Sequence, residues 1–398
     1  MHIVFFDHPA YLEYLSIPRF TKMLVDGMEQ RGHTTEVWKP TPYFLRFSAS
    51  KKYQKWLGYL DQYLVFPAQV RKRLKQFAAD TLFVFADQAQ GPWVPLVAHR
   101  PHVIHCHDFM AQHSASGKIS ENPTGWTGQQ YQNLIYRGYS QGRNFISVSE
   151  KTRKDLEELL PKPPKISEMV YNGLNKIFKP YDPSIARQEL GDKIGLALQQ
   201  GYLLHVGGNQ WYKNRLGVIE MYDAWRSTYN STLPLLLLGG ALSPELAEVV
   251  SQSRYKEDIH VIGGLDDKYV HLAYAGASVF LFPSLAEGFG WPIAEAMACG
   301  ALVITTDEAP MTEVAGTAGF LVRRRPHQAA AGEAQWAVET AVTLEKVVRL
   351  TGQERDEAVA AGYANARRFN SDNALDKIES IYLKALQQAG FPNKSETA

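Results

Sequence analysis

Short apolar runs recur along this sequence and alternate with stretches that have helical spacing. In the second half, five such runs have the length of strands: 202–206, 235–238, 260–262, 279–282 and 302–305. Near the N-terminus, 3–6 and 35–38 flank a helical stretch in the same way. Alternation of this kind indicates parallel sheets that are covered by helices on both faces. The predicted fold class is therefore α/β.

The chain is long enough for two large domains. Its 398 residues correspond to two or three domains of ordinary size. Prolines and other turn formers accumulate over 161–183, so we expect a domain junction near 175–195. The first domain is expected over 1–180 and the second over 181–370. Residues 371–398 are expected to form a final helix, which crosses back to the first domain, and a frayed tail.

Charge content excludes several classes of protein. The 42 Lys and Arg residues nearly balance the 41 Asp and Glu residues, for a net charge of +1. That balance argues against a disordered chain, a charged tail and a protein that coats a nucleic acid duplex. The sum hides an asymmetry, because residues 1–170 have a net charge of +6 and residues 171–398 have −5. The two halves are therefore expected to meet different partners.

Cysteine content and apolar runs indicate a cytoplasmic protein. Cys106 and Cys299 are too few for a disulfide scaffold or a structural zinc site, which favours a reducing compartment. The first residues lack a basic segment, and their apolar run ends at Asp7, so no secretory signal is expected. No apolar run approaches the roughly 18 residues of a membrane-spanning helix.

One stretch, 279–307, has the layout of a ligand-binding loop. A predicted strand leads towards the glycine-containing loop 287–290, and a helix follows that ends at Gly300. Glycines after a strand let backbone N–H groups approach an anion, and the N-terminus of the helix adds further donors. Glu287 in the loop and Glu295 in the helix are then expected to face one cleft and hold sugar hydroxyls. The alternative is a capped helix with a glycine turn and two solvated glutamates.

The same block is similar to a known family. Residues 287–300, E-G-F-G-W-P-I-A-E-A-M-A-C-G, resemble the signature of the retaining family 4 glycosyltransferases, which have the two-domain GT-B fold. Four further blocks resemble segments of that family and occur in the same order: 147–156, 171–180, 204–214 and 312–320. The resemblance covers 145–325 well and the N-terminal third weakly. It implies two Rossmann-like parallel-sheet domains that face a central cleft.

The resemblance also implies a nucleotide-sugar site in the second domain. It implies that Glu295 binds the nucleotide ribose, that Glu287 lies near the transferred sugar, and that Lys213 neutralises the diphosphate. The other implied donor-binding residues lie in three loops: Gly208, Asn209, Ile262, Gly263, Gly288, Phe289 and Gly290. A solvated surface position is the alternative for Lys213. Many family members have an arginine shortly before this lysine, whereas here Arg215 follows it.

The run His105-Cys106-His107-Asp108 is the main candidate in the first domain. From the residues alone, the alternatives are a metal site and histidines packed at a strand end. The resemblance implies instead that His107 and Asp108 line the acceptor cleft, with Asp108 fixing the tautomer of His107. The family's other histidine site in this domain would map near 83–87, where this chain has no histidine.

The loop after the first strand departs from the family pattern. Family members commonly have a glycine-rich loop there, whereas this chain reads Asp7-His8-Pro9-Ala10-Tyr11. Asp7 and His8 are candidates for the acceptor cleft by position alone, because open α/β sheets bind ligands at the carboxyl ends of their strands.

Residues 51–75 mix basic and aromatic side chains. They contain seven Lys and Arg residues, five aromatic residues and a single acid, Asp61. Such a composition fits an amphipathic surface that contacts anionic lipid. The alternative is an ordinary solvated helix pair packed by its aromatics. Nucleic acid is disfavoured, because no known binding module is present.

The residues and the family resemblance together predict a cytoplasmic, retaining glycosyltransferase. Whether it also contacts the inner face of the membrane is left open. It would move a hexose, such as mannose, glucose or galactose, from a nucleotide-diphosphate sugar to a glycan or lipid-linked saccharide acceptor in cell-surface polysaccharide or glycolipid synthesis. Glu287, His107 and Asp108 are the expected catalytic residues, and no metal or other cofactor is expected. A sugar-nucleotide epimerase and a non-catalytic binding protein on the same fold stay open as alternatives.

Overall fold

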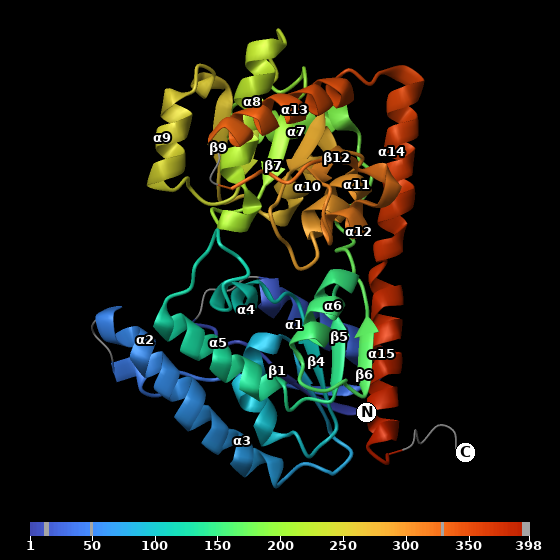
Figure 1. The fold of residues 1–398 in the computed structure, drawn as a ribbon. Helices are drawn as coiled ribbons and strands as arrows, with labels where there is room; N and C mark the ends of the chain where they lie inside the picture. Colours follow the sequence, from blue (N-terminus) through green and yellow to red (C-terminus); the bar gives the residue numbers. More distant parts are fainter. Residues whose placement is uncertain (12–15, 48–50, 328–329, 392–398) are drawn as a thin grey trace. The chain divides into compact units, whose positions relative to one another are not determined.

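The computed structural model describes residues 1–11, 16–47, 51–327 and 330–391. The chain divides into two compact units. Unit 1 consists of Met1–Tyr171 and Asp372–Ala398, and unit 2 consists of Asn172–Ser371. Each unit contains one sheet flanked by helices (Figure 1). In the described part of the chain, no helix is long and apolar enough to cross a membrane.

The sheet of unit 1 has six parallel strands in the order β2-β1-β3-β4-β5-β6. Their bounds are β1 His2–Phe6, β2 Thr34–Trp38, β3 Leu82–Phe85, β4 His102–Cys106, β5 Asn144–Ser147 and β6 Ile166–Met169. β3 is apolar and buried at every position, as expected for a strand covered on both faces. Aromatic rings fill the core against this sheet, among them Phe6, Phe85, Trp38 and Trp93.

Helices on the crossover connections cover this sheet, because parallel strands cannot be joined by tight hairpins. The α-helices are α1 Ser16–Gln30, α2 Lys51–Leu60, α3 Phe66–Leu74, α4 Met110–Ala115, α5 Trp126–Tyr139, α6 Glu150–Leu159 and α15 Ser371–Gln388. The other helical segments are the 3₁₀ helices η1 Leu45–Phe47 and η3 Gln88–Leu96, and the π-helix η2 Asp61–Val65. η2 continues α2 directly into α3.

The sheet of unit 2 also has six parallel strands, in the order β12-β11-β10-β7-β8-β9. Their bounds are β7 Leu203–Val206, β8 Leu235–Leu238, β9 Ile259–Ile262, β10 Val279–Phe282, β11 Leu302–Thr306 and β12 Phe320–Val322. The α-helices are α7 Pro183–Ile194, α8 Arg215–Thr228, α9 Pro244–Gln252, α10 Asp267–Gly276, α11 Trp291–Cys299, α12 Met311–Ala315, α13 Ala330–Val348 and α14 Gly352–Ala366. The 3₁₀ helices are η4 Trp211–Lys213, η5 Lys256–Asp258, η6 Gly316–Ala318 and η7 Arg367–Phe369.

The predicted α/β class is confirmed, and every run that the sequence predicted to be a strand is one. Among the strands that were not predicted, β12 is the shortest, with three residues of mixed burial. A run this short has no clear hydrophobic pattern from which a strand could be predicted. The helix expected near Pro292 is α11, which ends at Gly300 with a φ of 93°. That left-handed conformation favours glycine and stops the helix.

The chain passes into unit 2 at Asn172, earlier than the junction expected near 175–195. The segment after Asn172 is held within unit 2 by its backbone. Leu174 N donates to the Phe369 carbonyl at 2.8 Å, and the Gly173 carbonyl accepts from Trp291 Nε1 at 3.3 Å. The prolines near residue 180 therefore follow the junction and do not mark it.

Helix α15 joins unit 1 through a buried apolar face that includes Leu375, Ile378 and Tyr382, and through polar side chains beside it. Tyr382 is fully buried, and its Oη lies 2.7 Å from His105 Nε2 in the middle of β4. Burial lowers the pKa of His105 to about 3, so its imidazole is neutral. On the surface, Glu379 Oε1 lies 2.6 Å from His33 Nε2, and Lys384 Nζ lies 3.1 Å from Glu168.

Replacing Tyr382 with phenylalanine tests this anchor. The variant leaves His105 Nε2 buried without its partner, so we expect a loss of about 1–3 kcal/mol in the free energy of unfolding. Chemical denaturation followed by circular dichroism measures it. Tyr181→Phe is the matched control, since that hydroxyl bonds Glu189 at the surface, and its loss should be well below 1 kcal/mol. Equal stability of both variants would contradict the anchoring role.

Candidate functional site

The loop after β10 and the 3₁₀ helix η4 meet in a buried ion pair. Lys213 Nζ donates to Glu287 Oε1 at 2.7 Å, and Ser284 Oγ donates to the same oxygen at 2.9 Å. The Lys213 ammonium also lies 4.9 Å from the centre of the Phe282 ring. Both charged side chains are largely withdrawn from solvent. The interpretation of Lys213 as a solvated surface lysine is therefore wrong.

Asn214 fixes the position of this pair. It has a φ of 52°, the left-handed region, and is the N-cap of α8. Its side-chain oxygen accepts from Gly217 N at 3.2 Å, while its amide nitrogen donates to the Pro283 carbonyl at 2.8 Å. One side chain therefore ties the start of α8 to the end of β10. Asparagine tolerates this backbone conformation better than most residues do.

A buried arginine lies beside the first glycine loop. Arg215 is 2% exposed, and its Nη1 donates to Asn209 Oδ1 at 2.8 Å and to the Gly240 carbonyl at 2.9 Å. Its Nε and Nη2 are buried and have no hydrogen-bond partner among the described residues. Burial lowers the pKa of Arg215. A buried cation without a carboxylate partner is destabilising unless an anion approaches it.

Glycine loops meet one another beside Arg215. A side chain at Gly239 would place its Cβ 2.1 Å from the Gly207 carbonyl, and the φ of Gly239 is 145°, so only glycine fits there. Gly239 N in turn donates to the carbonyl of Ile262, at the end of β9. A Cβ at Gly263 would lie 3.0 Å from the Gly239 carbonyl. The structure therefore brings the loops that contain Gly207, Gly239 and Gly263 together at the carboxyl ends of β7, β8 and β9.

Glu295 lies on α11, which begins after the predicted glycine loop. Gly290 precedes the helix with a φ of 105°, and Phe289 is buried against Phe369. Tyr274 Oη donates to Glu295 Oε2 at 2.9 Å. Burial, with the charge of Glu295, raises the pKa of Tyr274 well above its ordinary value, so this hydroxyl remains a donor. Glu295 is thus not the freely solvated glutamate of the alternative interpretation.

In unit 1, His8 and Asp87 form a nearly buried pair. His8 Nε2 lies 2.9 Å from Asp87 Oδ2, where β1 and β3 end. Burial raises the pKa of Asp87, but the hydrogen bond and charge of His8 outweigh it and lower the pKa overall. The sequence analysis did not predict Asp87 as a site residue, because the family resemblance implies a histidine near that position. An acid directly after a buried strand was the available signal.

The other first-loop candidate, Asp7, has a structural partner. Asp7 Oδ1 accepts from Thr21 Oγ1 at 2.9 Å. Thr21 belongs to α1, so this bond joins the helix to the end of β1. The predicted neighbours Asp7 and His8 therefore have different partners: one is tied to a helix and the other to Asp87.

His107 is held by backbone groups at the end of β4. Its Nε2 lies 2.9 Å from the Ala86 carbonyl, which can only accept, so this nitrogen carries the proton. Burial lowers the pKa of His107, which favours the neutral ring. Phe20 lies edge-on, with the ring centres 4.7 Å apart. His107 Nε2 thus donates to the Ala86 carbonyl and not to Asp108, the residue that was expected to fix the tautomer.

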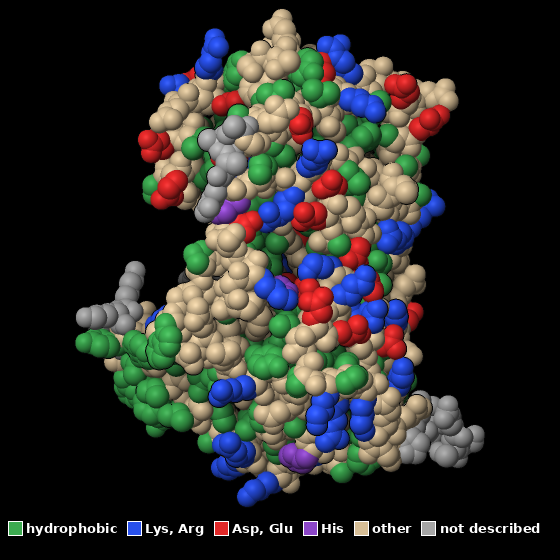
Figure 2. All heavy atoms as spheres, in the orientation of Figure 1, with side chains coloured by type: hydrophobic (Ala, Val, Ile, Leu, Met, Phe, Trp, Pro, Cys, Tyr) green, Lys and Arg blue, Asp and Glu red, His purple; other side chains and the backbone are tan. Residues whose placement is uncertain are grey.

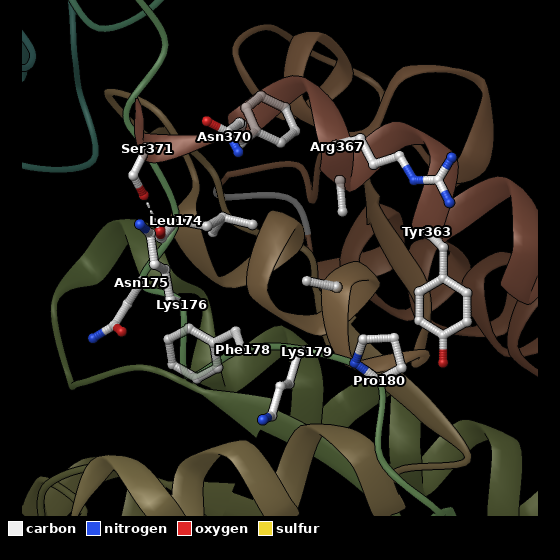
Figure 3. A pocket seen from close by; sticks show the side chains of 13 residues that line it. Leu174, Asn175, Lys176, Phe178, Lys179, Pro180, Tyr363, Arg367, Asn370 and Ser371 are labelled. Carbon is white, nitrogen blue, oxygen red and sulfur yellow. Dashed lines mark hydrogen bonds between the residues drawn. The ribbon is translucent and has the colours of Figure 1, made fainter. Parts of the chain in front are cut away.

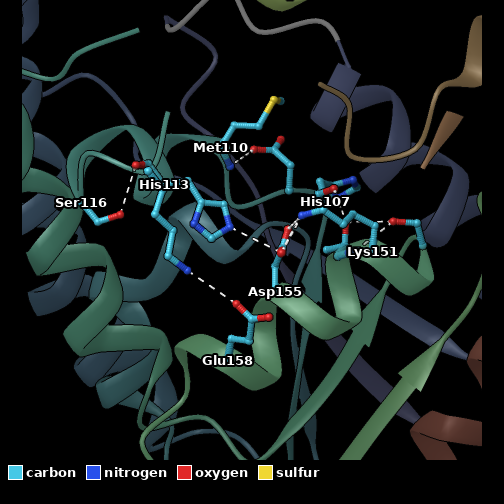
Figure 4. A network of polar contacts seen from close by, with 11 residues as sticks. His107, Met110, His113, Ser116, Lys151, Asp155 and Glu158 are labelled. Carbon is cyan, nitrogen blue, oxygen red and sulfur yellow. Dashed lines mark hydrogen bonds and ion pairs between the residues drawn. The ribbon is translucent and has the colours of Figure 1, made fainter. Parts of the chain in front are cut away.

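Asp108 follows His107 in the chain and bonds the backbone at the start of α4; Figure 4 shows the polar network that contains His107, Met110, His113 and Asp155. Asp108 Oδ1 accepts from Met110 N at 3.0 Å, at the start of α4. In the same network, Asp155 Oδ2 accepts from Lys151 Nζ at 2.5 Å, and Asp155 Oδ1 lies 3.5 Å from His113 Nε2. No group of three or more His, Cys, Asp or Glu in the described ranges is arranged to hold a metal ion. His105 is packed against Tyr382, as the simpler interpretation expected.

A cavity of about 460 Å³ lies elsewhere in unit 2 (Figure 3). Segments 174–180 and 363–371 supply most of its lining, with Ala298 from α11. No residue that the sequence predicted for the site lines this cavity. Its basic side chains, Lys176, Lys179 and Arg367, are exposed. We therefore assign the candidate donor site from the hydrogen bonds around Lys213 and not from this cavity.

Two parallel six-stranded units of this kind define the GT-B class of glycosyltransferase folds. Among solved structures, the Anabaena protein HepE in complex with UDP and glucose matches with a TM-score of 0.69 at 17% identity, over 96% of this chain and 98% of that chain. WaaG, a glycosyltransferase involved in lipopolysaccharide biosynthesis, matches with a TM-score of 0.70 at 15% identity, over 96% and 99%. At such identities the likeness shows the fold, and the predicted GT-B architecture is confirmed.

Sequence families identify the chain further. Residues 17–176 match Glycosyltransferase Family 4, and residues 200–340 match Glycosyl transferases group 1. Together the two matches cover more than half of the chain. The chain belongs to family 4 of the glycosyltransferases, as the sequence blocks predicted.

Curated relatives match over part of their length. O-antigen chain mannosyltransferase B of Escherichia coli is 25% identical over 250 residues, which are 62% of each chain. A Campylobacter jejuni enzyme, N-acetylgalactosamine-N,N'-diacetylbacillosaminyl-diphospho-undecaprenol 4-alpha-N-acetylgalactosaminyltransferase, is 28% identical over 175 residues, 44% of each chain. The chain thus spans less than two thirds of the length of these relatives.

The His8–Asp87 pair makes a pH-dependent prediction. The folded pKa of Asp87 is below its ordinary value, so the pair contributes stability that is fully present above about pH 4 and is lost as the pH falls through the folded pKa. His8→Ala removes the bond and the charge that lower this pKa. We expect the pKa to rise, and acid unfolding, followed by circular dichroism, to begin at a higher pH than in the wild type. The exposed His99→Ala variant should match the wild type, and identical acid midpoints for all three proteins would contradict the pairing.

Proposed function

We propose that this chain is a retaining glycosyltransferase that transfers a hexose from a nucleotide-diphosphate sugar to a saccharide acceptor. The observation that carries the proposal is the clustering of Lys213 and Arg215, both largely buried, beside glycine loops at the carboxyl edge of the unit 2 sheet. Two cations next to close-approaching backbone suit a ligand with concentrated negative charge, such as a diphosphate.

Lys213 and Glu287 would exchange partners when the donor binds. Without ligand, the ammonium of Lys213 is neutralised by Glu287. A diphosphate with greater charge would draw Lys213 towards itself and leave the Glu287 carboxylate to accept hydrogen bonds from sugar hydroxyls. As the sugar–oxygen bond breaks, negative charge grows on the departing diphosphate, so Lys213 stabilises the transition state more than the bound donor.

Retention of configuration follows if the acceptor attacks the face from which the diphosphate leaves. The acceptor oxygen forms a bond to the anomeric carbon as the bond to the diphosphate oxygen breaks, and the acceptor proton passes to that departing oxygen. No side-chain nucleophile is needed in this scheme. Because Lys213 and Arg215 supply positive charge, we propose that the reaction needs no metal ion.

The acceptor is assigned to unit 1. The neutral His107, protonated at Nε2, leaves Nδ1 as an acceptor for a sugar hydroxyl. His8 and Asp87 offer a polar pair at the same edge of the sheet. Relatives named for O-antigen mannosyl transfer and for transfer to a diphospho-undecaprenol saccharide support a glycan or lipid-linked acceptor in cell-surface polysaccharide or glycolipid synthesis.

We place the enzyme in the cytoplasm, in peripheral contact with the inner face of the membrane. Its two cysteines are free and buried, which suits a reducing compartment. A lipid-linked acceptor would be met at the membrane surface, and residues 51–75 of the acceptor unit would make that contact. The structure named for HepE with UDP-glucose makes UDP-sugars the first donors to test, with mannose, glucose and galactose as the hexoses.

A donor panel tests this function. The protein is incubated with UDP- and GDP-hexoses, with and without saccharide acceptors, and released nucleoside diphosphate is measured. We expect release that depends on acceptor, an α-linked product from an α-linked donor, and the same rate in the presence of EDTA. Tight donor binding without release would indicate a binding protein, and donor conversion without acceptor would indicate an epimerase. Abolition by EDTA with rescue by a divalent ion would exclude the metal-free scheme.

Glu295→Ala tests the donor site. A carboxylate that accepts from ribose hydroxyls contributes about 1.5–3 kcal/mol, so we expect donor affinity to fall by tenfold or more in calorimetry. Tyr274→Phe, which removes a hydrogen bond to Glu295 without removing the carboxylate, should weaken binding less. Glu245→Ala on the surface of α9 is the matched control. Unchanged affinity in Glu295→Ala would remove this assignment.

A further inference from the structure

Large apolar side chains gather on the surface of unit 1 over η1, α2 and η2. They form what we call the outer aromatic face: Tyr43, Phe44, Phe47, Tyr53, Trp56, Leu60 and Leu64. Figure 2 shows hydrophobic side chains gathered over α2, at the lower left of the view. Seven of the sixteen exposed large hydrophobic residues described in the chain lie in this short stretch. Isolated exposed hydrophobics are ordinary, whereas a contiguous patch marks an interaction surface.

The helical part of this face is a single stripe. Tyr53, Trp56, Leu60 and Leu64 follow one another at intervals of three and four residues, which places them on one side of a continuous helix. Trp56 is 65% exposed and Leu64 62% exposed. An amphipathic helix normally turns such a stripe towards the core, but here the stripe faces solvent.

The opposite side of the same helix makes the contacts with unit 1. Tyr63 Oη lies 2.9 Å from Tyr131 Oη on α5, and the ring of Tyr59 stacks on Tyr131 at 5.8 Å. Phe66 is buried against Trp93. The aromatics of 51–75 therefore divide into a packed inner set and an exposed outer set. Packing against α5 and Trp93 explains the inner set, whereas the side chains of the outer set stay exposed.

Asp61 brings η1 into the same surface. It is fully buried, and its carboxylate accepts from the backbone N–H groups of residues 43, 44 and 45 at 2.8–3.1 Å. This holds the preceding loop against the helix. The guanidinium of Arg46 then lies 4.9 Å from the ring centres of both Tyr43 and Phe47. Phe47 is 71% exposed.

The segment that carries the outer aromatic face is cationic. Residues 37–79 contain nine Lys and Arg residues and one acid, Asp61. Since Asp61 is buried and bonded to three N–H groups, no acidic side chain of this segment offsets the exposed Arg46 and Lys55. Trp, Phe and Leu side chains beside Lys and Arg suit the boundary between headgroups and acyl chains of an anionic bilayer.

We propose that the outer aromatic face binds the surface of an anionic lipid bilayer. Trp56, Leu64 and Phe47 enter the boundary region, while Arg46 and Lys55 contact lipid phosphates. The aliphatic tips of Leu60 and Leu64 have no counterpart in the polar surface of a nucleic acid. This inference adds to the proposed function how unit 1 reaches a lipid-linked saccharide. It rests on the proposed function only for the identity of that acceptor.

Vesicle co-sedimentation of the full chain tests this surface. We expect binding to phosphatidylglycerol-containing vesicles and much weaker binding to pure phosphatidylcholine vesicles. The double variant Trp56→Ser with Leu64→Ser should bind at least tenfold more weakly. Val338→Ser with Val342→Ser removes two equally exposed side chains from α13 of unit 2, and it should bind as the wild type does. Thermal unfolding verifies that each variant is folded.

A second variant tests the charge separately. Arg46→Gln with Lys55→Gln should weaken binding to the anionic vesicles by about fivefold for each charge removed and should reduce the salt dependence of binding. Three results would overturn the proposal: a wild type that does not bind anionic vesicles, a Trp56/Leu64 variant that binds them fully, or a wild-type dimer that this variant dissociates.

The transfer assay with a water-soluble acceptor and no vesicles keeps the two proposals apart. Vesicle binding without transfer contradicts only the proposed function. Transfer without vesicle binding contradicts only the membrane surface.

Discussion

Parallel strands cannot be joined by tight turns, and this constraint arranges both units. Every connection must cross a face of the sheet as a helix, so the loops that leave the carboxyl ends of the strands collect along one edge. In unit 2 that edge holds Lys213, Glu287 and the glycine loops. In unit 1 it holds the His8–Asp87 pair and His107. The chemistry of the chain is therefore concentrated where the topology leaves backbone and polar groups available.

The two edges differ in how their charges are balanced. In unit 1, burial would raise the pKa of Asp87, and His8 offsets that effect with a hydrogen bond and a nearby charge. In unit 2, Glu287 balances Lys213, but Arg215 has only an amide oxygen and a carbonyl at one of its nitrogens. The charges at the unit 1 edge are thus balanced by each other, whereas the unit 2 edge keeps an excess of buried positive charge. That difference is what suits unit 2 to an anionic ligand.

The fold followed from sequence more readily than the contacts of the site. Strand positions depend on local apolar runs, and the block 287–300 identified the loop and the helix that contain Glu287 and Glu295. Asp87 and the buried setting of Arg215 were not found, because they depend on loops that are distant in sequence and adjacent only after folding. The start of unit 2 at Asn172 depends on such contacts too: hydrogen bonds to Phe369 and Trp291 hold the segment that follows it, and the positions of prolines do not report them.

The return of α15 to unit 1 gives the chain an order of assembly. Unit 2 is continuous, so all of its strands are available once residue 371 has been synthesised, whereas the contact between His105 and Tyr382 spans 277 residues. During synthesis, unit 1 therefore emerges first and is completed last, and its sheet lacks the cover of α15 while unit 2 folds. A nascent chain of this protein would complete unit 2 before it completes unit 1.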